Sequence, residues 1–278
     1  MEKCLMRSGT TEFNLSQYSK LETCSLPQYA SPASVAVPKV LWKYPSAALT
    51  LARNEIHLWR VRLDQALADV DPFNAMLSED ESGRAARYHF ERDRRRFTLR
   101  RALLREILSR YLDTEPAGLR FAYGPCGKPA LAFPRDDNLH FNLSHSDGLA
   151  LYAVTREGAI GVDIERVRVI REAGQIAARF FSPQEVAEWR SLPGDQRPEW
   201  FLRHWSRKEA GLKMSGQGLF DATAPALSQR EGAERNGATS WPQCSGLGRA
   251  GVRVLYELTP APEYVGALAL AAPGVVRG

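Results

Sequence analysis

The sequence predicts an α/β protein built from two similar halves. A strand residue, a helix-capping serine and a helical phenylalanine of the first half each recur 104 residues later. The three pairs are Ile56 and Ile160, Ser78 and Ser182, and Phe97 and Phe201. We therefore expect two similar α/β subdomains related by a pseudo-twofold axis. The functional site is expected in the cleft between them, because ligands often bind where domains meet.

Residues 1–44 are expected to form a flexible N-terminal extension. The segment has no clear hydrophobic periodicity, and it carries Pro27, Pro32 and Pro38 among several serines. Terminal segments of this composition are commonly poorly ordered. The two predicted subdomains then occupy residues 45–157 and 158–278.

The first subdomain begins with a strand and two helices. Residues 55–63 have the composition of a strand. Ser78 and Glu81 have the spacing of a capping box, in which the side chains and backbone amides of both residues pair, so a helix is expected to begin between them. A longer helix is expected at 93–112, where apolar residues recur at helical spacing.

The rest of the first subdomain is predicted as turns and short strands. The glycines and prolines of residues 124–129 indicate a turn. Short strands at 141–143 and 149–154 flank a loop that contains the polar cluster Asn142-Leu143-Ser144-His145-Ser146. A histidine beside serine donors suits a phosphate group, although an ordinary turn would have the same composition.

The second subdomain starts with a strand at residues 160–167. Ser182 and Glu185 repeat the capping box, and Pro183 occupies the favoured first position of the helix. Residues 226–250 are rich in Gly, Ser, Ala and charged residues, which predicts an inserted loop before the last strands.

Composition is typical of a soluble globular protein, with 44% hydrophobic and 25% charged residues in 278. The longest apolar stretches are too short to cross a bilayer, and residues 1–13 lack the apolar core of a signal peptide. We therefore expect a cytoplasmic protein. The four cysteines have no metal-ligand spacing, so free thiols are expected.

Positive charge is concentrated in one segment of the chain. Residues 84–110 contain ten arginines and three acidic residues, whereas the whole chain has a net charge of +5. Such a segment indicates an anionic partner, namely a nucleic acid, a phosphorylated cofactor or an acidic protein. The alternative is a solvated helix whose charges pair with one another.

Two acidic motifs predict a metal and phosphate site. Asp163 and Glu165 are two residues apart in a predicted strand, so they share a face and repel each other unless a cation lies between them. Glu209 and Lys213 are four residues apart, on one face of a predicted helix. Three carboxylates and a lysine together would suit Mg²⁺ and a phosphorylated substrate. An edge strand and a simple ion pair are the alternatives.

In this order the motifs resemble those of a known family, the 4'-phosphopantetheinyl transferases of the surfactin-synthetase (Sfp) type. The resemblance covers about residues 50–272. It rests on Gly127-Lys128-Pro129, on residues 142–146 and 161–165, on Phe180-Phe181-Ser182 and on residues 205–219. It implies a monomer that binds coenzyme A between its halves. The phosphopantetheine arm would move to a serine of an apo acyl or peptidyl carrier protein, with release of adenosine 3',5'-bisphosphate.

The resemblance also implies a role for each matching residue. Asp163, Glu165 and Glu209 would bind Mg²⁺, Glu209 would activate the carrier serine, and Lys213 would stabilise the leaving group. The residues implied in coenzyme A binding are Arg84, Arg96, Arg101, Lys128, Ser144, His145 and Lys213. Phe97 stands where some relatives have a threonine near the 3'-phosphate, so the nucleotide contacts of this helix are expected to differ.

Two other functions remain open from the sequence. A Mg²⁺-dependent phosphodiesterase would use the same carboxylates but transfer to water. A basic nucleic-acid-binding module would use the arginines of 84–110 but would leave the carboxylates unexplained. The resemblance favours the transferase, without a nucleic acid or a membrane as partner.

Overall fold

A four-stranded antiparallel sheet organises the first half of the chain. The structure, a computed structural model, describes residues 21–27, 42, 49–53, 55–64, 70–216 and 252–271. The strands of this first sheet lie in the order β1-β2-β6-β5. They are β1 (Leu21–Pro27), β2 (Glu55–Arg62), β5 (His140–Ser146) and β6 (Leu149–Thr155). The mixture of helix and sheet expected from the sequence is confirmed.

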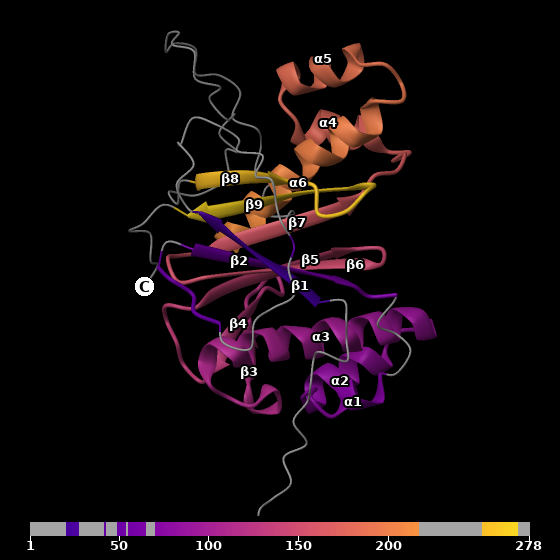
Figure 1. Ribbon diagram of the computed structural model, residues 1–278. Helices are drawn as coiled ribbons and strands as arrows, with labels where there is room; N and C mark the ends of the chain where they lie inside the picture. Colours follow the sequence, from indigo (N-terminus) through magenta and orange to yellow (C-terminus); the bar gives the residue numbers. More distant parts are fainter. Residues whose placement is uncertain are drawn as a thin grey trace, which may run out of the picture.

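Helices cover one face of this first sheet (Figure 1). They are α1 (Asp71–Asn74), α2 (Glu79–Ala86) and α3 (Glu91–Leu112). The short η2 helix (Pro116–Gly118) follows α3 and leads into a ribbon formed by β3 (Arg120–Tyr123) and β4 (Pro129–Phe133). The long α3 helix therefore lies between the sheet and the outer helices.

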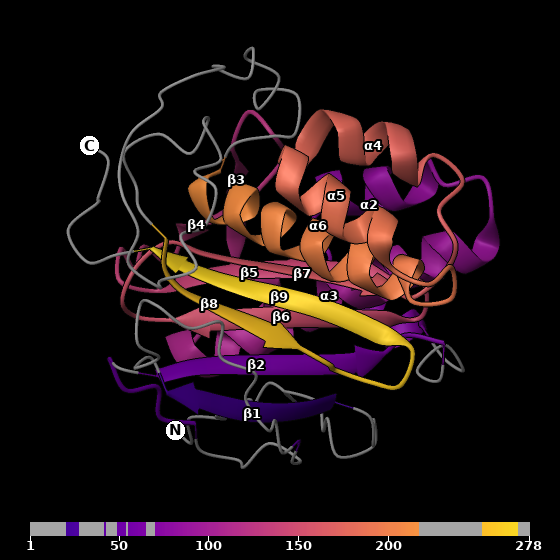
Figure 2. The same cartoon turned by 90° about the horizontal axis from the view of Figure 1, so that it is seen from above.

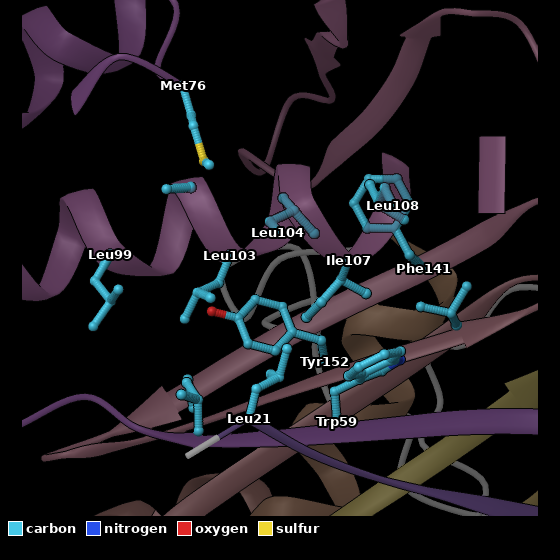
Figure 3. Close-up of a cluster of buried hydrophobic side chains, with 14 of the residues drawn as sticks. Leu21, Trp59, Met76, Leu99, Leu103, Leu104, Ile107, Leu108, Phe141 and Tyr152 are labelled. Carbon is cyan, nitrogen blue, oxygen red and sulfur yellow. The ribbon is translucent and has the colours of Figure 1, made fainter. Parts of the chain in front are cut away.

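The core between α3 and the first sheet is formed by large apolar side chains. Leu103 and Ile107 point from α3 toward Trp59 and Tyr152 of the sheet (Figure 3), and Leu104 belongs to the same cluster. All five are at most 1% exposed. Burial of a side chain of this size contributes about 1.5–3 kcal/mol, so this contact fixes α3, and its arginines, against the sheet.

A three-stranded sheet organises the second half. Its strands are β7 (Ile160–Arg166), β8 (Val252–Leu258) and β9 (Tyr264–Ala271), in the order β7-β9-β8. The helices α4 (Ala173–Phe180), α5 (Pro183–Ser191) and α6 (Arg197–Ser215) lie on the side away from the first sheet (Figure 1). Helix α6 packs directly on this sheet, with Ala210 and Met214 against the small side chains of β9.

The two sheets share a second core. Leu58 and Leu151 of the first sheet pack in one cluster with Val162, Ile164 and Leu268 of the second. Seen from above, β5 and β7 run side by side where the sheets meet, with α6 beside them (Figure 2). This arrangement brings the polar residues 142–146 next to the acidic residues of β7.

Both predicted capping boxes are confirmed. Ser78 and Glu81 cap α2, and Ser182 and Glu185 cap α5. In each box the glutamate carboxylate accepts a hydrogen bond from the serine backbone amide, at 3.2 Å and 2.7 Å respectively. Because capping depends on residues within one turn, local sequence was sufficient to predict these helix starts.

The extension expected to be flexible contains a strand. Residues 21–27 form β1, which pairs along its whole length with β2, from Leu21 opposite Val61 to Pro27 opposite Glu55. Leu21 and Leu26 are buried in the two cores. The prediction of an unstructured segment is therefore wrong for these seven residues, because apolar residues of this strand find partners on a distant part of the chain.

Two further predictions are affected by the structure. The polar cluster at 142–146 was expected in a loop, but it belongs to β5, which continues to Ser146 before a tight turn to β6. The predicted insertion at 226–250 lies outside the described residues.

Among the described residues, no helix is both long enough and apolar enough to span a membrane. In the described part of the chain, Cys24 is buried, Cys126 is exposed, and neither forms a disulfide.

Candidate active site

Side chains of β5 bridge the two sheets. Alternate residues of a strand point to the same face, and here Ser144 and Ser146 both point toward β7. Ser144 Oγ donates to Asp163 Oδ1 at 3.0 Å, and Ser146 Oγ donates to Glu165 Oε2 at 3.0 Å. Asn142, on the same face, accepts from the Val162 amide at 2.8 Å. The two predicted strand carboxylates are thus held in place by serines of the other half of the chain.

Helix α6 approaches β7 unusually closely at Gly161. A Cβ atom at this position would collide with the backbone of Ala210 and Met214. Only glycine permits this approach, which places the C-terminal part of α6 against the strand. As a result Lys213 Nζ donates to Asp163 Oδ1 at 2.6 Å and to Ser144 Oγ at 2.9 Å.

Asp163 lies at the centre of the site and has one unused oxygen. Its side chain is 4% exposed, and its Oδ2 atom has no hydrogen-bond partner among the described residues. An unpaired buried acceptor costs about 1–3 kcal/mol, and more when the group is charged. This orphaned oxygen indicates that the site accommodates another donor or a cation.

The other two predicted carboxylates are close enough to Asp163 to interact with it. Burial first, and then the negative charge of Asp163, raise the pKa of Glu165 and the pKa of Glu209. Lys213 opposes the shift at both residues. The residues therefore share one electrostatic environment. In the described part of the chain, however, they are not gathered into a preformed three-ligand metal cluster.

The donor set nevertheless fits a hard divalent cation. Mg²⁺ prefers oxygen ligands and is typically held by one or two carboxylates together with substrate phosphates. Asp163, Glu165 and Glu209 offer carboxylate oxygens, and Asp163 Oδ2 is unpaired. Burial, and then repulsion by the charge of Asp163, raise the pKa values of Glu165 and Glu209, and a bound cation would relieve that repulsion.

A group of positive charges lies next to the carboxylates. His145 is on the opposite face of β5 from Ser144, and its neighbours include Arg96, Arg100 and Lys213. Although the residue is exposed at the surface, desolvation of its ring by neighbouring groups, and then the positive charges of Arg100, Lys213 and Arg96, lower the pKa of His145 to about 3. The imidazole is therefore neutral at physiological pH. It can donate one hydrogen bond and accept another, and the cations around it attract an anion.

Two of the predicted binding residues have other partners. Arg101 donates to the carboxylate of Glu81 and to the hydroxyl of Tyr123. Lys128 donates to the backbone carbonyls of Ile160, Lys213 and Met214 at 3.1, 2.6 and 3.3 Å. Burial lowers the pKa of the Lys128 ammonium to about 8. Its contacts tie the turn at 124–129 to the C-terminal end of α6.

Apart from Arg100, the remaining arginines of the basic segment are exposed or paired. Arg84 is exposed and stacks on Tyr123, with 5.0 Å to the ring centre. Arg96 makes two hydrogen bonds of 2.7 Å to Asp64. Further pairs join Arg94 and Arg95 to Glu91, Arg105 to Glu81, and Arg110 to Glu106. Much of the charge of α3 is therefore neutralised locally, which weakens the case for a nucleic-acid surface.

Two residues of the site were not among the predicted site residues. Ser146 holds Glu165, and its place two residues after Ser144 would have revealed it if the segment had been recognised as a strand. Arg100 lies four residues after Arg96, on the same face of α3. Nothing in the sequence distinguishes Arg100 from the neighbouring arginines.

The fold and the site define an α/β protein with a carboxylate and lysine centre beside an anion-attracting basic group. Residues 159–239 match the family model of the 4'-phosphopantetheinyl transferase superfamily. Residues 66–157 match the model of the 4'-phosphopantetheinyl transferase N-terminal region. The chain belongs to the 4'-phosphopantetheinyl transferase superfamily.

Curated relatives support this membership. The chain is 40% identical over 236 residues to the 4'-phosphopantetheinyl transferase HetI of Nostoc sp. strain PCC 7120, covering 84% of this chain and 94% of the relative. It is 38% identical over 162 residues to the putative 4'-phosphopantetheinyl transferase slr0495 of Synechocystis sp. strain PCC 6803, covering 58% of this chain and 65% of that relative. The Sfp enzyme of Bacillus subtilis strain 168 is 29% identical over 164 residues, which are 58% of this chain and 71% of Sfp.

Proposed function

We propose that this protein transfers the 4'-phosphopantetheine arm of coenzyme A to a serine hydroxyl of an apo carrier protein. Adenosine 3',5'-bisphosphate is the second product. The observation that carries the proposal is the centre formed by Asp163 and Lys213, in which a buried carboxylate keeps one oxygen unpaired. Family membership supplies the substrate class.

The carboxylates of Asp163, Glu165 and Glu209 would hold Mg²⁺. Their oxygens suit this ion. Burial, and then the nearby negative charge of Asp163, raise the pKa of each glutamate. When bound, the ion would neutralise charge on the diphosphate of coenzyme A. Ser144 and Ser146 keep the strand carboxylates in position by hydrogen bonds.

Glu209 is proposed as the base that accepts the proton of the carrier serine. Burial raises the pKa of Glu209, which brings it closer to the working pH and makes it a better base than an exposed glutamate. The serine oxygen forms a bond to the phosphorus that bears the pantetheine arm. The bond from this phosphorus to the bridging oxygen breaks, and the electron pair leaves with adenosine bisphosphate.

Lys213 is proposed to stabilise the departing phosphate. It lies one helical turn from Glu209, and its side chain is 30% exposed while its ammonium contacts Asp163. A positive charge fixed beside the bridging oxygen stabilises the negative charge that develops there. Ser144, His145 and Arg96 are proposed to bind the phosphates of coenzyme A. The same role stays a prediction for Arg84, Arg101 and Lys128, whose contacts lie elsewhere.

We also propose that the halves, 45–157 and 158–278, are related by a pseudo-twofold axis. In the first half, strand β2 is followed by the capped helix α2, the long helix α3 and the strand pair β5 and β6. In the second half, strand β7 is followed by the capped helix α5, the long helix α6 and the strand pair β8 and β9. In both halves the last strand of the pair lies between the other two strands. The strand orders β2-β6-β5 and β7-β9-β8 support this relationship. The two family models adjoin at residue 158, which also supports the division.

The experiment is intact-mass analysis of apo acyl and peptidyl carrier proteins after incubation with the protein, coenzyme A and Mg²⁺. We expect the carrier to gain the mass of one phosphopantetheine arm, and a carrier whose acceptor serine is changed to alanine to gain none. Release of adenosine bisphosphate without a carrier would instead support a phosphodiesterase. Absence of both products with every carrier would refute the proposed function.

A further inference from the structure

Arg100 is a buried cation without a carboxylate partner. Its side chain points from α3 into the protein and is 8% exposed. Nε donates to the carbonyl oxygen of Arg96 at 3.3 Å, and the guanidinium also hydrogen-bonds to the hydroxyl of Tyr88. Within the part of the chain that the structure describes, no acidic group lies within ion-pair distance of it.

The other buried arginines of the same helix are neutralised. Arg101 and Arg105 share the carboxylate of Glu81, which is 1% exposed. Removing a charge from water costs several kcal/mol unless a counter-charge compensates. Burial accordingly lowers the pKa of the Arg100 guanidinium. Arg100 thus differs from its neighbours in lacking an internal counter-ion.

The surroundings of Arg100 favour an anion as this missing counter-ion. Arg100, Lys213 and Arg96 all act on the imidazole of His145, in that order of strength. Arg96 is bound to the carboxylate of Asp64 and Lys213 to that of Asp163, so among the described residues Arg100 is the cation of the three that no carboxylate neutralises. An anion beside His145 would therefore supply the counter-charge that Arg100 lacks.

We propose that Arg100 is a phosphate-binding residue that makes the site specific for a nucleotide with a 3'-phosphomonoester. The inference rests on the proposed function. The diphosphate must approach Asp163 and Lys213, which contact Ser144 on one face of β5. Arg100 and His145 lie toward α3, on the other face, so they are available to the separate monoester. A guanidinium can bind such a dianion through two parallel hydrogen bonds.

The first test compares nucleotide binding by thermal unfolding. Adenosine 3',5'-bisphosphate should raise the melting temperature of the wild-type protein more than adenosine 5'-monophosphate does, because a ligand that binds only the folded state stabilises it. Arg100→Leu and Arg100→Gln should lose this difference while their unliganded melting temperature stays the same or rises. The control is Arg95→Leu, which removes an exposed arginine paired with Glu91 and should respond like wild type.

The second test compares coenzyme A with 3'-dephospho-coenzyme A as substrate. A charged hydrogen bond of this kind corresponds to about 10–100-fold in kcat/KM. Arg100→Gln should lose that factor with coenzyme A and change less than about 3-fold with the dephospho form. Arg100→Lys, which keeps the charge but not the paired donors, should lie between wild type and Arg100→Gln.

Two results would overturn the proposal. One is an equal loss on both substrates with a lower unliganded melting temperature, which would give Arg100 a structural role. The other is a nucleotide preference that survives in both variants. Failure of the wild-type protein to modify any carrier would refute the transferase function instead, while the nucleotide comparison would still report on Arg100.

Discussion

Lys213 of α6 and Asp163 of β7 form an ion pair of 2.6 Å in which the carboxylate is nearly buried and the ammonium remains partly exposed. The pair joins the helix that carries the proposed base to the strand that carries the proposed metal ligands. Because Gly161 allows α6 to approach the strand, the geometry of the site depends on backbone packing as well as on the charged side chains.

Replacing Asp163 by asparagine should abolish transfer while the protein stays folded. The substitution preserves shape but removes the central negative charge. We expect carrier modification to fall by at least about 100-fold, since an electrostatic group at a reacting centre typically contributes that much. Asp137→Asn, at an exposed residue paired with Arg135, is the matched control and should retain full activity. Normal turnover by Asp163→Asn would contradict the site assignment.

Lys213→Met should lower both activity and stability. Breaking a fully buried ion pair costs about 3–5 kcal/mol, but the exposure of Lys213 reduces this to about 1–2 kcal/mol. Chemical denaturation measures the change in the free energy of unfolding. The double variant Asp163→Asn, Lys213→Met should recover part of the loss, because no unpaired charge remains. Additive losses would show that the two residues do not interact.

Glu209→Gln should make the protein inactive but more stable at neutral and alkaline pH. Burial raises the pKa of Glu209 above its unfolded value, so the folded state binds the proton more tightly. Stability is therefore lost as the pH rises from the ordinary glutamate range through the folded pKa. Melting temperatures of wild type and variant should converge at acidic pH and separate above it. A variant less stable than wild type at neutral pH would contradict the sign of this shift.

Glu81→Gln should strongly destabilise the first half of the chain. The carboxylate of Glu81 is shared by Arg101 and Arg105, so its removal leaves two buried charges without a partner. We expect a loss of about 3–5 kcal/mol in the free energy of unfolding. The control is Glu91→Gln, which removes only exposed ion pairs of α3 and should lower the free energy of unfolding by less than about 1 kcal/mol.

Deletion of residues 1–27 should lower the stability of the protein. If this segment were dispensable, the deletion would leave the stability unchanged. The deletion removes β1 and the buried side chains of Leu21 and Leu26, each contributing about 1.5–3 kcal/mol. Deletion of residues 1–20 is the control, because it keeps the strand. Equal melting temperatures for the two truncated proteins would show that β1 contributes nothing.

Local sequence was sufficient for the elements that depend on near neighbours. The capping boxes at Ser78 and Ser182 and the helical spacing of α3 are set within one or two turns, and the structure agrees with each. The alternation of Asp163 and Glu165 in a strand likewise put both carboxylates on one face before any tertiary contact was known.

Only the tertiary structure decided which partner each charged or apolar side chain has. Lys128 binds backbone carbonyls of α6, Arg101 binds Glu81, and Arg100 lies beside His145 without a carboxylate. Arg100 and Arg101 are adjacent in the sequence, yet only Arg101 has a carboxylate partner among the described residues. The difference arises because the partner of each side chain depends on which distant segments pack against it. The seven residues of β1 show the same dependence, since an isolated strand becomes stable only when another strand supplies its hydrogen bonds.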